Sequence, residues 1–233
     1  NGSRFRIDRF DVTKLERDLS LVFDDSEWDW GGGDFTLSFP ETLDAGLFRV
    51  TMRGRGLRVV PTAGHTLTLA HPLVGDGGFC VCGEGTVAFG AGAYRFAGPA
   101  CATSGTIDLA SAGTVSGAAF GGGDGVIRGG SLARATVALE VDGTGVATNG
   151  VPHFADCTFT GAVRVDLGRT EEEPLDSLPQ DVLVARYSGT TAPSAVLWRL
   201  RGTGLRHVRG VFRVQDGEVR MDAVPCGAIL ILR

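Results

Sequence analysis

The sequence contains GTVAF at residues 85–89, GTIDL at 105–109, GVIRG at 125–129 and GVAT at 145–148. Each segment opens with glycine and continues with alternating or β-branched residues, which is typical of a short strand with one buried face. The four glycines recur every 20 residues. A fixed period of this length is typical of a solenoid, whose coils are stabilised by stacking on their neighbours. The segments therefore predict an all-β chain with a β-solenoid architecture.

The composition agrees with many short strands joined by tight turns. The chain has 233 residues, of which 36 are glycine and 43% are hydrophobic. Glycine at this density, without the strict triplet of collagen, indicates frequent turns. The length is sufficient for one elongated domain with a sizeable core.

The regions on either side of the repeat differ from it. Upstream, in residues 1–74, short alternating runs follow one another irregularly, which predicts an N-terminal cap or irregular β coils. Residues 75–233 are expected to form the solenoid with its C-terminal closing strands, such as 163–167 and 182–187. No charge run separates these parts, so we expect one continuous domain.

The glycine-led strands and the segments that follow them carry a family resemblance. After the repeat come VLVARY at 182–187, WRLRGTG at 198–204 and VFRVQDGEVR at 211–220. Over residues 75–233 the chain resembles autotransporter-passenger-like proteins, and in particular the autotransporter-associated β-strand repeat proteins of bacterial surfaces. The resemblance implies a right-handed parallel β-helix, export to the cell surface or medium, and a role as a stalk, adhesin or scaffold.

The charge pattern and hydropathy exclude several classes of partner. The net charge is −5, and Lys14 is the single lysine among 22 basic residues. A nucleic-acid partner is not expected, because acidic residues outnumber basic ones and no basic run is present. No apolar run approaches the ~20 residues needed to span a bilayer. Coding bias is the simplest explanation for the arginine excess, and an arginine-lined surface for acidic glycans is the functional alternative.

Five cysteines leave at least one thiol unpaired, and none has zinc-ligand spacing. Cys80 and Cys82 lie two residues apart, so both face the same side of a strand. Cys101 follows about one solenoid coil later, so a Cys80–Cys101 or a Cys82–Cys101 bridge is expected. The alternative is that these cysteines are buried as small apolar side chains. Cys157 and Cys226 have no predicted partner.

The most unusual tract is DDSEWDWGGGD at residues 24–34. Its simplest interpretation is a solvent-facing turn whose tryptophans cover the first coil. A functional interpretation assigns Trp28, Trp30, Asp29 and Asp34 to a glycan site, because tryptophan rings stack on sugars while carboxylates accept hydroxyl hydrogen bonds. A Ca²⁺ site of carboxylate oxygens is a third interpretation, and no other cofactor is expected.

Catalytic residues are harder to identify. Asp108, Asp124, Asp142 and Asp166 could align across successive coils, as a hydrolase or lyase would need, although turns are rich in aspartate for conformational reasons. The histidines lack a local serine or cysteine motif.

The leading hypothesis is a non-catalytic extracellular structural or interaction module that contacts a polysaccharide or cell-surface glycan. The alternatives are a carbohydrate-active β-helix enzyme, either a polysaccharide lyase or a glycoside hydrolase, and a self-associating surface scaffold. An enzyme should show a groove on one solenoid face where at least two carboxylates, or a basic residue and an acid, converge within hydrogen-bond range of a sugar. A binding module should show exposed, coplanar tryptophans and no such convergence.

Overall fold

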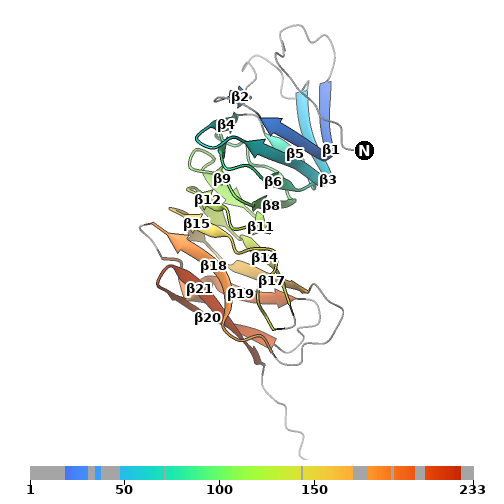
Figure 1. Ribbon diagram of the computed structural model, residues 1–233. Coiled ribbons are helices and arrows are strands. Elements are labelled where there is room, and N and C mark those ends of the chain that lie inside the picture. The colour runs from blue at the N-terminus through green and yellow to red at the C-terminus, as the bar shows by residue number, and fades with distance from the viewer. Residues whose placement is uncertain are drawn as a thin grey trace, which may run out of the picture.

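The computed structural model describes residues 19–30, 35–37, 48–70, 72–142, 144–169, 178–189, 192–202 and 208–226. Among these residues there is no α-helix, and the helical element is the 3₁₀ turn η2 (Ala195–Leu197). Strands stacked along the long direction of the molecule make up the rest of its regular structure (Figure 1). The prediction of an all-β chain is confirmed.

Two long sheets, A and B, and a short sheet C contain the described strands. Sheet A consists of β1 (Leu19–Trp30), β3 (Phe48–Pro61), β5 (Leu73–Gly75), β6 (Phe79–Val81), β8 (Pro99–Ala102), β11 (Ala119–Gly121), β14 (Thr136–Val141), β17 (Val163–Arg169) and β19 (Trp198–Gly202). Sheet B consists of β2 (Phe35–Leu37), β4 (Thr66–Leu69), β7 (Thr86–Phe89), β9 (Thr106–Asp108), β12 (Val126–Arg128), β15 (His153–Ala155), β18 (Val182–Ser188), β21 (Glu218–Pro225) and β20 (Val208–Gln215). Sheet C consists of β10 (Thr114–Ser116), β13 (Ser131–Ala133) and β16 (Thr158–Thr160).

From β9 to β18 the chain visits sheets B, C and A in turn. Apart from β10, which begins sheet C, each new strand pairs in parallel with the previous strand of its sheet. Parallel strands need such crossover connections, because a two-residue hairpin can join only antiparallel strands. The arrangement of parallel sheets is compatible with a β-helix.

At the C-terminal end of the stack the pairing of strands changes from parallel to antiparallel. Strand β21 pairs antiparallel with β18, and β20 pairs antiparallel with β21. The hairpin between β20 and β21 turns at Asp216 and Gly217, whose φ angles are 52° and 79°. Two consecutive residues with positive φ are what a type I′ hairpin turn requires, and Asp-Gly is a preferred pair for it.

The period of 20 residues is confirmed for the first three glycine-led segments. Thr66, Thr86, Thr106 and Val126 are aligned in successive strands of sheet B. The prediction is wrong for Gly145, which lies in a loop, while the strand aligned with Val126 begins at His153.

The aligned, inward-facing residues of sheet B explain why the alternating segments of the sequence form this sheet. Leu67, Val87, Ile107, Ile127 and Phe154 are in register and each is at most 1% exposed. Burying a side chain of this kind stabilises the fold by about 1.5–3 kcal/mol relative to leaving it exposed. Within the described part of the chain, the buried residues are hydrophobic and none is charged.

Aromatic rings form a continuous row through this core. Successive centroids are 5.1–6.4 Å apart, within the range at which aromatic pairs attract each other. The row runs through Phe89, Tyr94, Phe120, Phe154, Phe159, Trp198 and Phe212.

Tyr94 brings a hydroxyl group into this apolar row. Its Oη atom is buried and has no hydrogen-bond partner among the described residues. Burial also raises the pKa of the Tyr94 hydroxyl well above its ordinary value, because an ionised phenolate would lose its hydration. The missing hydrogen-bond partner indicates that the hydroxyl destabilises the core, and the raised pKa means that the hydroxyl stays protonated.

We expect Tyr94→Phe to increase the free energy of unfolding by about 1–2 kcal/mol, because a buried unsatisfied hydroxyl carries a desolvation penalty. Urea denaturation at neutral pH measures the change, with half-buried Tyr187→Phe as the matched control. Since the folded pKa is raised, stability is retained below about pH 10 and falls as the pH rises further. The variant should lose this part of the alkaline dependence. A destabilised Tyr94→Phe protein would contradict the prediction.

Candidate functional site

The predicted glycan residues Trp28, Asp29 and Trp30 belong to β1, the first described strand of sheet A. Their register partners in β3 are Val59, Val60 and Pro61. The positions of these three side chains lie outside what is described, and so does residue Asp34. The glycan site therefore stays a prediction, located on β1 and the residues that follow it.

Sheet B carries a second group of polar residues, which we call the sheet-B polar face. Its members come from β9, β12, β15, β18 and the turn before β12, and their backbone hydrogen bonds to neighbouring strands hold them in successive levels of the stack. They are Asp108, Asp124, Arg128, His153, Arg186 and Ser188.

Asp108 and Arg128 form the closest ion pair of the sheet-B polar face. They are register partners on β9 and β12, and Asp108 Oδ2 lies 2.6 Å from an Arg128 guanidinium nitrogen. Asp108 Oδ1 also accepts a 2.9 Å hydrogen bond from the backbone N–H of Ala110. The Arg128 side chain is 48% exposed, so solvent screens the pair and it contributes at most about 1 kcal/mol.

Asp124, in the turn before β12, also binds donors of the protein itself. Its Oδ1 atom accepts a 3.1 Å hydrogen bond from the N–H of Val151, and Arg186 lies 3.7 Å from the same oxygen. These contacts connect the turn before β12 to Val151, which precedes β15, and to Arg186 on β18. Both carboxylates of the sheet-B polar face are therefore engaged by the protein's own donors.

His153 and Ser188 form a pair that the sequence spacing did not predict. His153 Nε2 and Ser188 Oγ are 2.9 Å apart, although 35 residues separate them in the chain. A Ser–His nucleophile also needs a third group that orients the histidine. Among the described residues, the hydrogen bonds of His153 include no such carboxylate, so the pair is a polar contact between strands rather than a triad.

The four aspartates suggested for catalysis do not align. Asp108 lies on sheet B and Asp166 on sheet A, whereas Asp124 and Asp142 lie in turns. Asp142 closes its own loop, because the Thr144 hydroxyl and the Val146 N–H donate to its Oδ1 atom and hold the pKa of this carboxyl below its ordinary value. The aligned row that a hydrolase or lyase would need is therefore not formed by these four residues, because they lie on two different sheets and in two turns.

The cysteines lie in three different environments. Of the two bridges left open by the sequence, Cys80–Cys101 is formed, between aligned residues of β6 and β8. Cys82 is a half-buried free thiol and Cys226 an exposed one. Burial, followed by the charge of Asp156, raises the pKa of the Cys157 thiol to about 12. Cys157 therefore stays protonated, consistent with its hydrogen bonds to the carbonyls of Ile127 and Gly129.

The described residues contain no group of three or more His, Cys, Asp or Glu side chains arranged to hold a metal ion. The acidic tract at 24–34 suggested for Ca²⁺ is outside that statement, because its side chains are not described. In the described part of the chain, no helix has the length and hydropathy to cross a membrane.

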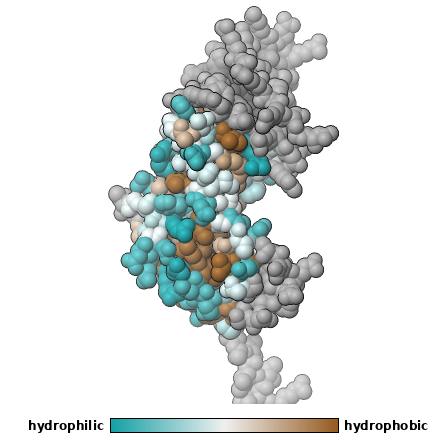
Figure 2. Space-filling model, in the orientation of Figure 1, coloured by the Kyte–Doolittle hydropathy of each residue, from teal (hydrophilic) through white to brown (hydrophobic). Residues whose placement is uncertain are grey.

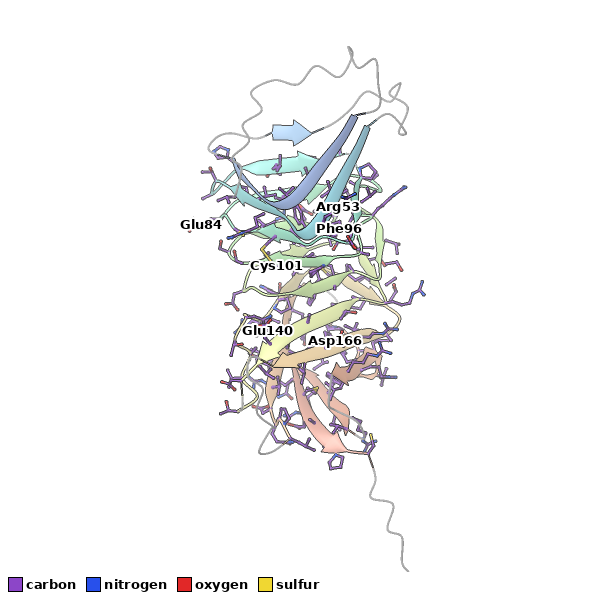
Figure 3. All side chains as sticks on the ribbon, turned by 90° about the vertical axis from the view of Figure 1, so that its right-hand side faces the viewer. Arg53, Glu84, Phe96, Cys101, Glu140 and Asp166 are labelled. Atoms are coloured by element: carbon purple, nitrogen blue, oxygen red, sulfur yellow. A yellow bond between two sulfur atoms is a disulfide. The ribbon has the colours of Figure 1, made fainter. Side chains whose placement is uncertain are left out.

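On the face that Figure 2 shows, hydrophilic residues surround a smaller hydrophobic patch in the C-terminal half. Figure 3 shows side chains projecting outward from the stack, with Cys101 and Asp166 at different levels of sheet A. The mutually paired charges of the sheet-B polar face are spread along several strands and do not converge on one reacting atom.

The chain matches no protein-family model, and neither the curated proteins nor the solved structures contain a significant match.

Proposed function

We propose that the chain is a right-handed parallel β-helix that acts as a non-catalytic structural and interaction module, secreted or displayed on a bacterial cell surface. The observation that supports the proposal is the interior, which among the described residues is built from hydrophobic side chains and contains no buried charged residue. A core of this kind is expected of a scaffold whose repeats stabilise one another by stacking.

The disulfide supports the proposed location. Cys80–Cys101 joins neighbouring strands at the surface of sheet A. Disulfides persist in oxidising compartments outside the cytoplasm and are rare within it. The resemblance to autotransporter-passenger-like proteins implies the same location.

The proposed partner is a polysaccharide or cell-surface glycan that contacts Trp28 and Trp30, with Asp29 and Asp34 accepting hydroxyl hydrogen bonds. Two tryptophans on one strand provide stacking faces for sugar rings. The dispersed aspartates and the engaged carboxylates of the sheet-B polar face weigh against a lyase or hydrolase, which needs a convergent acid and base.

A panel of neutral and acidic polysaccharides tests this proposal. The full chain is titrated with each polymer by calorimetry and tryptophan fluorescence, and the same mixtures are assayed for new reducing or unsaturated ends. We expect binding without new ends, and we expect Trp28→Ala/Trp30→Ala to weaken binding about ten-fold or more.

Trp198→Phe is the matched control, because Trp198 is only 1% exposed. It should retain both binding and the fluorescence response. New chain ends would show that the module is an enzyme. Binding that the double variant leaves unchanged would rule out the proposed site, and no binding to any polymer would remove the glycan as partner.

A further inference from the structure

A free thiol lies next to the disulfide on sheet A. Cys80 on β6 and Cys101 on β8 are register partners with a Cα–Cα distance of 4.6 Å (Figure 3 labels Cys101). Cys82 follows Cys80 by two residues, and its Sγ atom is 3.5 Å from Cys80 Sγ. A third sulfur is therefore in contact with one end of the bridge.

An arginine completes this cluster. Arg58 on β3 is the register partner of Cys80, and its Nε–H donates to Cys82 Sγ over 3.4 Å. A guanidinium donor binds a charged acceptor more strongly than a neutral one. The thiolate is the form of cysteine that attacks a disulfide, so this donor is placed on the atom that would carry the charge.

We propose that Cys80, Cys82 and Cys101 form a thiol–disulfide exchange site that opens the bridge between β6 and β8 without an external reductant. Cys82 releases its proton to solvent and its thiolate attacks Cys80 Sγ. The Cys80–Cys82 bond forms, the Cys80–Cys101 bond breaks, and Cys101 leaves with the bonding electron pair as a thiolate. One disulfide and one thiolate are present before and after, so nothing is oxidised or reduced overall.

The Cα–Cα distances determine which of the two disulfides predominates. Residues two apart on a strand, such as Cys80 and Cys82, have Cα atoms about 6.6 Å apart, near the upper limit for a disulfide. The Cα–Cα distance between Cys80 and Cys101 is 4.6 Å, which lies within the usual range. Cys80–Cys101 is thus the resting form and Cys80–Cys82 the minor one. In the minor form Cys101, which is half-buried in the resting form, becomes a modification site for thiol-reactive electrophiles and disulfides.

Alkylation of the native protein tests the exchange. The full chain carries Cys226→Ser, which removes the exposed thiol and the exchange between molecules that this thiol would cause. It is incubated with excess iodoacetamide at mildly alkaline pH, acid-quenched, and mapped by mass spectrometry without reduction. We expect one product labelled on Cys82 with Cys80–Cys101 intact, and a second labelled on Cys101 with Cys80–Cys82 bridged.

Two further variants in the same background sharpen the result. Cys82→Ser should reduce Cys101 labelling at least about ten-fold, because the attacking thiolate is absent. Arg58→Gln should slow Cys101 labelling while the resting bridge persists. Buried Cys157 reports global opening, and it should stay unlabelled throughout.

Several outcomes would overturn the proposal. Label on Cys82 alone would show that no exchange occurs. Label on Cys80 with a Cys82–Cys101 bridge would show attack on the other sulfur. Cys101 labelling that persists in Cys82→Ser, or that rises together with label on Cys157, would assign it to unfolding. The distribution of label between Cys82 and Cys101 in the Cys226→Ser protein tests the proposal even if Cys82→Ser or Arg58→Gln fails to fold.

Discussion

Phe120→Ala is expected to reduce the free energy of unfolding by about 3–5 kcal/mol, the usual cost of removing a fully buried aromatic side chain. Phe120 is fully buried, and its ring lies 6.4 Å from Tyr94 and 5.6 Å from Phe154, measured between centroids. The substitution opens a cavity in the middle of the aromatic row and removes contacts with the levels on both sides. Urea denaturation followed by circular dichroism measures the loss.

Phe159→Ala is the matched control for this prediction. Phe159 belongs to the same aromatic row but is only half-buried, so less apolar surface is lost and solvent fills part of the space. We expect a loss well below that of Phe120→Ala. Equal losses for the two variants would mean that the interior can collapse around Phe120, and that the row is not a rigidly packed core.

The sequence was sufficient to predict the class of fold and many of the strands. The strand predicted at 163–167 is β17, which begins at Val163 and extends to Arg169, and its alternation of buried and exposed residues matches the sequence pattern. The alternation of apolar and polar residues can be recognised in the sequence because strand side chains point to opposite faces with a period of two. The antiparallel hairpin at the C-terminal end was missed, although the Asp216-Gly217 pair signals a tight turn.

Register across the stack could not be predicted beyond the regular repeat. Between Val126 and His153 the chain makes an excursion in which Asp142 accepts hydrogen bonds from Thr144 and Val146. The added residues displace Gly145 from the repeat. Because alignment of distant residues depends on every connection between them, the contact of His153 with Ser188 and that of Cys82 with Arg58 could not be inferred from spacing.

The repeated glycines are explained by the space available, more than by backbone conformation. A Cβ atom on Gly125 would lie 2.5 Å from the carbonyl oxygen of Ala102 and 2.6 Å from that of Gly105, in the preceding level of the stack. Real Cβ atoms do not approach carbonyl oxygens this closely, so a side chain at this position forces neighbouring levels apart. This close approach gives a reason for a glycine every 20 residues.

Gly125→Ala is therefore expected to destabilise the protein by about 3 kcal/mol through overpacking. Gly113→Ala is the matched control, because a Cβ there meets nothing within 4 Å and only the positive φ of 73° opposes alanine. That backbone strain alone costs about 1 kcal/mol. Urea denaturation of the two variants separates steric conflict between levels from local strain. Similar losses at the two positions would mean that the levels are not in tight contact at Gly125, and the repeated glycines would need another explanation. A clearly larger loss of stability in Gly125→Ala than in Gly113→Ala would show that the 20-residue glycine period reflects the close approach of successive strands in the stack.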